Sequence, residues 1–168
     1  KRLLPEGVIA SDSDELEGRF PHGKANLATS CLVYEALRTS AILAEELGEK
    51  ELAEEYRDWR EELGRAIDTY FGCQIYGFDT YRYCEANEAL RSWICIPLTM
   101  GIQKRRKATL EALFSDWLWT ENGLLTMEGD KVFWDRSTLY GLRGAFMAGE
   151  PEKGLYYLRK YSEQRLLG

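Results

Sequence analysis

Two kinds of hydrophobic pattern alternate along the chain. Residues 25–47 carry few charged side chains, and apolar or small residues occupy almost every direction, which is typical of a helix buried on most sides. Residues 49–71 repeat apolar residues every three or four positions beside a face crowded with Glu and Asp, which is typical of a helix with one solvated face. Gly48 separates the two segments, and glycine is a common residue at a helix end. The pattern therefore predicts a buried inner helix followed by a solvated outer helix.

The same couple recurs twice. Residues 87–100 predict a second inner helix, in which Pro97 should bend the helix or end its regular hydrogen bonding early. Residues 103–119 predict its outer partner, and residues 135–148 and 152–167 predict a third pair. We therefore expect an all-α fold built from three αα-hairpins with alternating inner and outer helices, as a single domain.

The connections predict where a site would lie. Connections inside each hairpin are short and marked by glycine, whereas residues 72–86 and 120–134 form long connections between hairpins. Residues 1–24 lead into the first inner helix in the same sense, so all three long segments belong at the N-terminal ends of the inner helices. Short β-like stretches are expected at residues 71–79 and 124–133. Loops on a rigid scaffold commonly carry functional residues, so this end of the bundle is the candidate functional end.

Charge and cysteine content exclude several classes of function. The net charge of -6 argues against a general nucleic-acid binder, which needs clustered Lys and Arg. No apolar run reaches the roughly 18 residues that a membrane helix needs. The four cysteines show no CxxC spacing, and His22 is the one histidine, so we expect no metal site and no cofactor. Cys31 and Cys95 lie in apolar stretches and are expected in the core.

Two segments, residues 77–87 and 133–141, resemble bacterial α-L-rhamnosidase-like six-hairpin glycosidases. The catalytic domain of that family is an (α/α)6 toroid of six inner and six outer helices, so the resemblance implies that the three hairpins are half of a toroid. It further implies a carbohydrate substrate and a larger catalytic domain of which residues 1–168 are a fragment. We expect such a fragment to be a poor catalyst alone, and to associate with itself or with the remainder of the toroid through uncovered apolar faces.

The resemblance places catalytic carboxylic acids in loops at the N-terminal ends of the inner helices. Glycoside hydrolysis usually needs two carboxyl groups, one as proton donor and one as base or nucleophile. The candidates are Glu85, Asp79 and Asp135. Glu85 stands among aromatic residues, where partial desolvation favours an acid role. Asp135 suits the N-cap of the third inner helix better than direct catalysis, whereas Asp79 equally suits a partner for Arg82 or the cap of a turn.

Aromatic and cationic residues of the same two segments are candidate substrate-binding groups. Trp134 and Tyr81 have faces on which a sugar ring stacks. Arg82 and Arg136 suit sugar hydroxyls or a uronate carboxylate, although Arg82 equally suits an ion pair with Glu85. We expect these groups to line one cleft.

Three functions remain open on this reasoning. The favoured one is a glycoside hydrolase domain that uses carboxylate general acid/base catalysis on a carbohydrate substrate. The second is a non-catalytic helical-repeat module that binds carbohydrate or another protein, because stacked αα-hairpins also build solenoids. The third is another α/α toroid, such as a sugar epimerase or a cyclase, and the lack of a Cys/His cluster disfavours a zinc-dependent cyclase.

Overall fold

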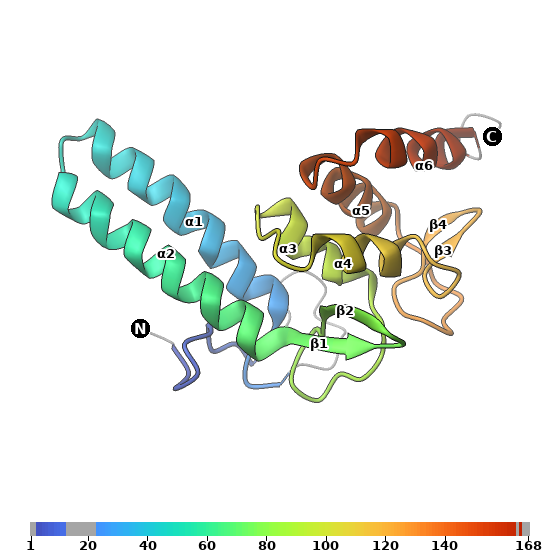
Figure 1. The fold of residues 1–168 in the computed structure, drawn as a ribbon, viewed down its shortest axis with the longest axis horizontal. Helices are drawn as coiled ribbons and strands as arrows, with labels where there is room; N and C mark the ends of the chain where they lie inside the picture. Colours follow the sequence, from blue (N-terminus) through green and yellow to red (C-terminus); the bar gives the residue numbers. More distant parts are fainter. Residues whose placement is uncertain (1–2, 13–22, 164, 166–168) are drawn as a thin grey trace. The chain divides into compact units, whose positions relative to one another are not determined.

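A computed structural model describes residues 3–12, 23–163 and 165 of the chain (Figure 1). The regular elements follow one another in this order: α1 (Leu27–Glu46), α2 (Lys50–Phe71), β1 (Gly72–Ile75), β2 (Phe78–Tyr81), the 3₁₀ helix η1 (Ser92–Cys95), α3 (Ile96–Thr99), α4 (Arg106–Leu113), β3 (Trp119–Thr120), β4 (Gly123–Leu124), α5 (Asp135–Met147) and α6 (Pro151–Glu163).

The chain divides into two compact units. Unit 1 comprises residues 1–72 and 84–87, and unit 2 comprises residues 73–83 and 88–168. Unit 1 therefore contains the α1–α2 pair, and unit 2 contains the shorter helices and both small sheets.

The expected all-α class is wrong. The structure is 55% helical with 13% in strands, and it contains two small antiparallel sheets, β1–β2 and β3–β4, so the fold is a mixed one. The physical reason lies in the long connections, whose backbone amides and carbonyls need partners. Tyr76 and Gly77 both have positive φ, 52° and 83°, and this two-residue turn matches the twist of two antiparallel strands. Because the all-α class is wrong, the assignment of the fold as half of an (α/α)6 toroid is wrong as well.

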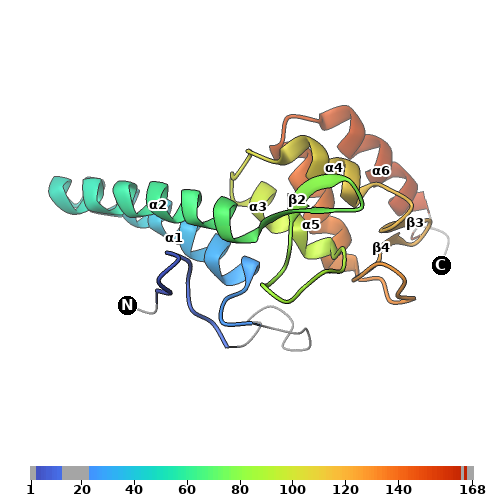
Figure 2. The ribbon, with the colours of Figure 1, turned by 60° about the horizontal axis from the view of Figure 1, so that its bottom comes forward.

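Unit 1 is organised by the α1–α2 pair, in which the two helices run side by side in opposite directions (Figures 1 and 2). The Asn26 side chain caps α1 by accepting a hydrogen bond from the Thr29 amide at 2.8 Å. Gly48, with φ of 81°, ends the first helix, as the sequence predicted. Gly64 of α2 allows close packing, because a Cβ there would lie 3.0 Å from the Tyr34 ring.

The burial of α1 differs between its two halves. Residues 27–31 are all buried, which agrees with the predicted inner helix. Towards the other end, however, Ile42 and Leu43 are 47% and 59% exposed, so the expectation of burial on most sides is wrong there. Beside Val33 and Leu37 of α1, the two helices and the N-terminal segment line an apolar pocket of about 350 Å³. Its lining includes Leu3, Ile9, Val33, Leu37, Trp59, Glu62 and Leu63.

The second predicted pair is shorter than expected. Residues 87–91 are not helical, and the inner element consists of η1 followed by the single turn of α3. Pro97 stands in the first turn of α3, where its missing amide is tolerated, so it begins a helical turn here and does not end one as predicted. The outer partner α4 spans eight residues.

The third predicted pair is present as α5 and α6, joined by a short turn at Gly149 with φ of 80°. Two glycines of α5 bring its backbone close to neighbours in unit 2. A Cβ at Gly144 would lie 3.2 Å from the Leu98 side chain, and one at Gly141 would lie 2.6 Å from that of Leu124. The core of unit 2 contains the fully buried Trp93.

Candidate functional site

Within unit 2, the long connection 120–134 lies against the residues that lead into the second inner element. Arg91 and Met127 form an isolated antiparallel bridge, and the Ser92 amide donates to the Thr126 carbonyl at 3.2 Å. The amide of Glu128 donates to the Leu90 carbonyl at 2.9 Å. Backbone hydrogen bonds therefore hold the connection, through residues 126–128, against residues 90–92 at the start of η1. These bonds place the connection 120–134 beside the start of the second inner element, as the sequence argument expected for that connection.

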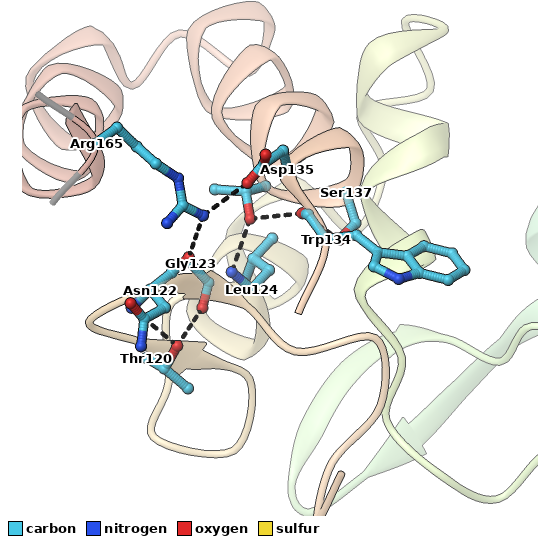
Figure 3. A network of polar contacts seen from close by, with 9 residues as sticks. Thr120, Asn122, Gly123, Leu124, Trp134, Asp135, Ser137 and Arg165 are labelled. Carbon is cyan, nitrogen blue, oxygen red and sulfur yellow. Dashed lines mark hydrogen bonds and ion pairs between the residues drawn. The ribbon is translucent and has the colours of Figure 1, made fainter. Parts of the chain in front are cut away.

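The connection 120–134 is also fastened to the N-terminal end of α5 (Figure 3). Thr138 Oγ1 accepts a hydrogen bond from the Leu124 amide at 2.9 Å and donates one to the Trp134 carbonyl at 2.9 Å. Gly123, with φ of 112°, is required here, because a Cβ would lie 2.5 Å from Thr138 Oγ1. The hairpin expected at residues 124–133 is present through the Leu125–Phe133 bridge.

Asp135 lies in the first turn of α5 and is held by Arg165. Arg165 Nη2 donates to Asp135 Oδ1 at 2.6 Å and to the Asn122 carbonyl at 3.2 Å (Figure 3). Hydrogen bonds from Arg165 and then Tyr161 lower the pKa of the Asp135 carboxyl, so it is ionised at neutral pH. The N-cap residue is Trp134 and makes no side-chain cap bond, so the N-cap role considered for Asp135 is not observed. The carboxylate still lies at the positive end of the helix dipole.

Asp79 in β2 forms an ion pair with Arg105, rather than the pair with Arg82 that we considered. The Asp79 side chain is 56% exposed, whereas that of Arg105 is 18% exposed. The Arg105 guanidinium lies 5.8 Å from the centre of the Tyr81 ring. Asp79 and Asp135 therefore each bind an arginine from a distant part of unit 2.

The candidate substrate-binding residues differ in exposure. Tyr81 is fully buried, so in this structure its ring contributes to packing and is not open to a sugar. Trp134 is half-buried, and Figure 3 shows its indole pointing away from the Asp135–Arg165 pair. Arg82 is half-buried and Arg136 is exposed.

Glu85 belongs to unit 1, whereas the other six candidates belong to unit 2. It lies in a turn that is fastened to the start of α1 by the Asn26–Cys84 bridge. Its side chain is exposed, and its Oε2 accepts a hydrogen bond from the Tyr70 hydroxyl at 3.4 Å. The structure thus gives Glu85 an open position at the N-terminal end of an inner helix, not an enclosed one.

Several functional candidates were missed by sequence reasoning. Asp130 accepts hydrogen bonds from the Lys131 amide at 2.7 Å and from Thr126 Oγ1 at 3.0 Å, and these bonds lower its pKa. Glu128, two residues earlier, binds a tyrosine that is distant in sequence. The acidic residues around Gly129 were the available signal for both, since acidic residues in a turn often bind nearby backbone amides. Arg165 gave no signal, because its partner Asp135 is 30 positions away.

Across residues 3–12, 23–163 and 165, no group of three or more His, Cys, Asp or Glu side chains is arranged to hold a metal ion. His22 lies outside the described residues. Within the same ranges, no helix combines the length and the apolar character needed to cross a bilayer. No protein-family model matches the sequence, and comparison with curated proteins finds no significant match.

Proposed function

We propose that this chain is a carbohydrate-active glycoside hydrolase domain that uses carboxylate general acid/base catalysis. The observation that carries the proposal is the position of Asp135, a carboxylate in the first turn of α5 that accepts a hydrogen bond from Arg165 in the loop region of unit 2. The resemblance of residues 77–87 and 133–141 to six-hairpin glycosidases supports the choice of a sugar as substrate. Asp135 lies within the second of these segments.

The electrostatics of each carboxylate suggests its role. Because Arg165 lowers the pKa of Asp135, this residue suits a base or nucleophile and does not suit a proton donor. Glu85 belongs to unit 1, so it is not combined with Asp135 in one site, and its role as proton donor stays the prediction drawn from the sequence resemblance. Asp79 is the third candidate, and its ion pair with Arg105 favours an electrostatic role.

The test measures hydrolysis of aryl glycosides, including 4-nitrophenyl α-L-rhamnopyranoside, by the intact polypeptide that carries this sequence. We expect Asp135→Asn to lower kcat/KM by about 10²-fold or more. Glu85→Gln should lower the rate strongly for sugars with poor leaving groups and less for the nitrophenyl glycoside, because a good leaving group needs little protonation. Glu88→Gln, which changes an exposed carboxylate three positions after Glu85, is the control and should keep full activity.

Full activity in both Asp135→Asn and Glu85→Gln would overturn the catalytic assignment. Circular dichroism must show that each variant is folded, since a loss of activity through unfolding carries no information on chemistry.

A specific observation favours a second candidate, a non-catalytic carbohydrate-binding module. Both candidate carboxylates of unit 2 are engaged by arginines, which disfavours a reacting role for either of them. Sugar binding by the intact polypeptide, with no hydrolysis of any glycoside tested, would support this module over the hydrolase.

A further inference from the structure

Two aromatic side chains of unit 2 stack on each other at the surface. Tyr76 is at the tip of the β1–β2 hairpin, and Trp117 is in the turn after α4. Their ring centroids are 4.2 Å apart and their planes differ by 5°. Nevertheless, Tyr76 is 53% exposed and Trp117 is 47% exposed. The pair, here called the aromatic platform, therefore keeps a large apolar area open to solvent.

The backbone of Tyr76 adopts an unfavourable conformation. Its φ of 52° makes it the non-glycine residue with positive φ among the described residues, and Gly77 follows with 83°. The first position of such a two-residue turn favours Asn, Asp or Gly, since a large side chain with positive φ costs about 1–2 kcal/mol. A large aromatic ring is thus retained where turn chemistry favours a small polar residue. Such outliers often mark functional positions.

A carboxylate fixes the platform. The Tyr76 hydroxyl donates to Glu128 Oε1 at 2.8 Å, and Glu128 Oε2 accepts from the Leu90 amide at 3.1 Å. The bond to Glu128 raises the pKa of the Tyr76 phenol, which therefore keeps its proton as donor. Stacking, hydrogen bonding and the tight turn together hold the ring in one orientation, so little conformational entropy is lost when a ligand binds.

The chemistry of the platform suits one face of a pyranose ring. Exposed aromatic faces bind the C–H groups of such a ring, and the carboxylate at the edge of Tyr76 offers an acceptor for its hydroxyls. The platform also uses the same connection, residues 120–134, that carries Trp134, because Glu128 belongs to that connection. Its residues are separate from the catalytic candidates Glu85, Asp79 and Asp135.

We propose that Tyr76 and Trp117 form a carbohydrate-stacking subsite, with Glu128 as the positioning residue that holds Tyr76 in place. The subsite binds a sugar unit of a polysaccharide through ring stacking, and it has no part in bond cleavage. The choice of a sugar as ligand rests on the proposed function.

Affinity electrophoresis of the intact polypeptide tests the subsite, with rhamnogalacturonan, xylan and hydroxyethylcellulose as the soluble probes in the gel. We expect at least one probe to retard the wild type. Tyr76→Asn removes the ring and places a residue that favours the turn, so the hairpin should persist while the dissociation constant rises at least 10-fold. Trp117→Ala should give a similar loss. Tyr156→Ala is the matched control, an exposed tyrosine on α6 at 52% exposure, and should bind as the wild type does.

Two further variants separate stacking from positioning. Tyr76→Phe keeps the ring but loses the bond to Glu128, and Glu128→Gln keeps the shape but loses the charge. Both should weaken binding only a few-fold, which is less than the loss expected for Tyr76→Asn.

Equal retardation of Tyr76→Asn, Trp117→Ala and the wild type would overturn the subsite, as would the absence of retardation by all three probes. Thermal unfolding of each variant shows whether it is folded. If Trp117→Ala is unfolded, Tyr76→Asn decides the question. Retardation without hydrolysis contradicts the catalytic proposal and leaves the subsite standing, whereas hydrolysis without a platform effect contradicts the subsite alone.

Discussion

Unit 1 and unit 2 reach stability in different ways. Unit 1 relies on two long helices, and its surface includes an apolar pocket and the exposed Leu43. Unit 2 has shorter helices, and hydrogen bonds join residues far apart in sequence, such as Tyr76 with Glu128. Its β1–β2 sheet packs against α4 through β2, and β4 packs against α5. The helical periodicity of the sequence therefore determines most of unit 1, whereas individual polar contacts between distant residues determine the geometry of unit 2.

The largest expected effect is in the core of unit 2. Trp93 is 1% exposed and packs edge-to-face against Tyr140, with the ring centroids 5.8 Å apart. Its Nε1 has no hydrogen-bond partner among the described residues. Trp93→Ala should therefore lose packing alone, and the free energy of unfolding should fall by about 3–5 kcal/mol. Denaturant unfolding measures this change.

Trp59 gives the matching test in unit 1. It is only half-buried and lines the apolar pocket, so Trp59→Ala should cost about 1–2 kcal/mol. Equal losses for Trp59→Ala and Trp93→Ala would contradict the expectation that the buried Trp93 contributes more to stability than the half-buried Trp59.

Next in size is a pair of glycine substitutions. Gly123→Ala forces a Cβ against Thr138 Oγ1 at a residue with φ of 112°, so it should cost about 2 kcal/mol or more and separate the hairpin from α5. Gly48→Ala in unit 1 has a similar φ penalty with open space around the new Cβ, and should cost about 1 kcal/mol. Thermal unfolding compares the two. A larger loss at Gly48 would show that the contact with Thr138 is easily relieved.

A helix cap in unit 1 gives a smaller effect. The fully buried Asn26 caps α1 and also donates to Ser11 Oγ at 3.2 Å, so Asn26→Ala should cost about 1–2 kcal/mol. Glu49, the N-cap residue of α2, makes no side-chain cap bond, and Glu49→Ala should leave the unfolding midpoint almost unchanged. Similar midpoints for the two variants would mean that the Asn26 bonds contribute little.

The smallest effect is the pH dependence of the Asp135–Arg165 pair. Because the pKa of Asp135 is lowered in the folded state, its stabilising contribution is present above the ordinary pKa of a carboxyl and is lost as the pH falls through the lowered value. The side chain of Asp135 is 64% exposed, so solvent screens the pair. Arg165→Gln should therefore reduce stability slightly at pH 7 and less at low pH, where Asp135 is protonated. An equal difference at both pH values would show that Arg165 acts through its bond to the Asn122 carbonyl or through packing.

Sequence reasoning predicted best where the pattern is long and local. The bounds of α1, α2, α5 and α6 lie within a few residues of those expected, because many consecutive positions carry the same signal. Residues 87–91 were predicted helical from their apolar character, but their backbone instead bonds to residues 126–128, a choice that only tertiary contacts make. The sequence indicated strand character around Tyr76, but the fold class was still expected to be all-α and not mixed.

The candidate site was less predictable for the same reason. The sequence indicated that Asp135 begins an inner helix, and the structure agrees. It did not indicate that Arg165 would be its partner, or that Arg105 would pair with Asp79, because no local pattern relates residues 26–30 positions apart. The burial of Tyr81 was likewise missed, since an aromatic residue at a strand end suits both packing and binding.

The bond between Tyr76 and Glu128 has a consequence for the time course of folding. It closes a loop of 52 residues, whereas α1 and α2 are joined by a short turn and meet through local contacts. Loops of greater length cost more entropy to close, and chains rich in local contacts fold faster. We therefore expect the helix pair to form early and the aromatic platform to be among the last features assembled, so that a ligand of the platform would recognise only chains whose unit 2 has finished folding.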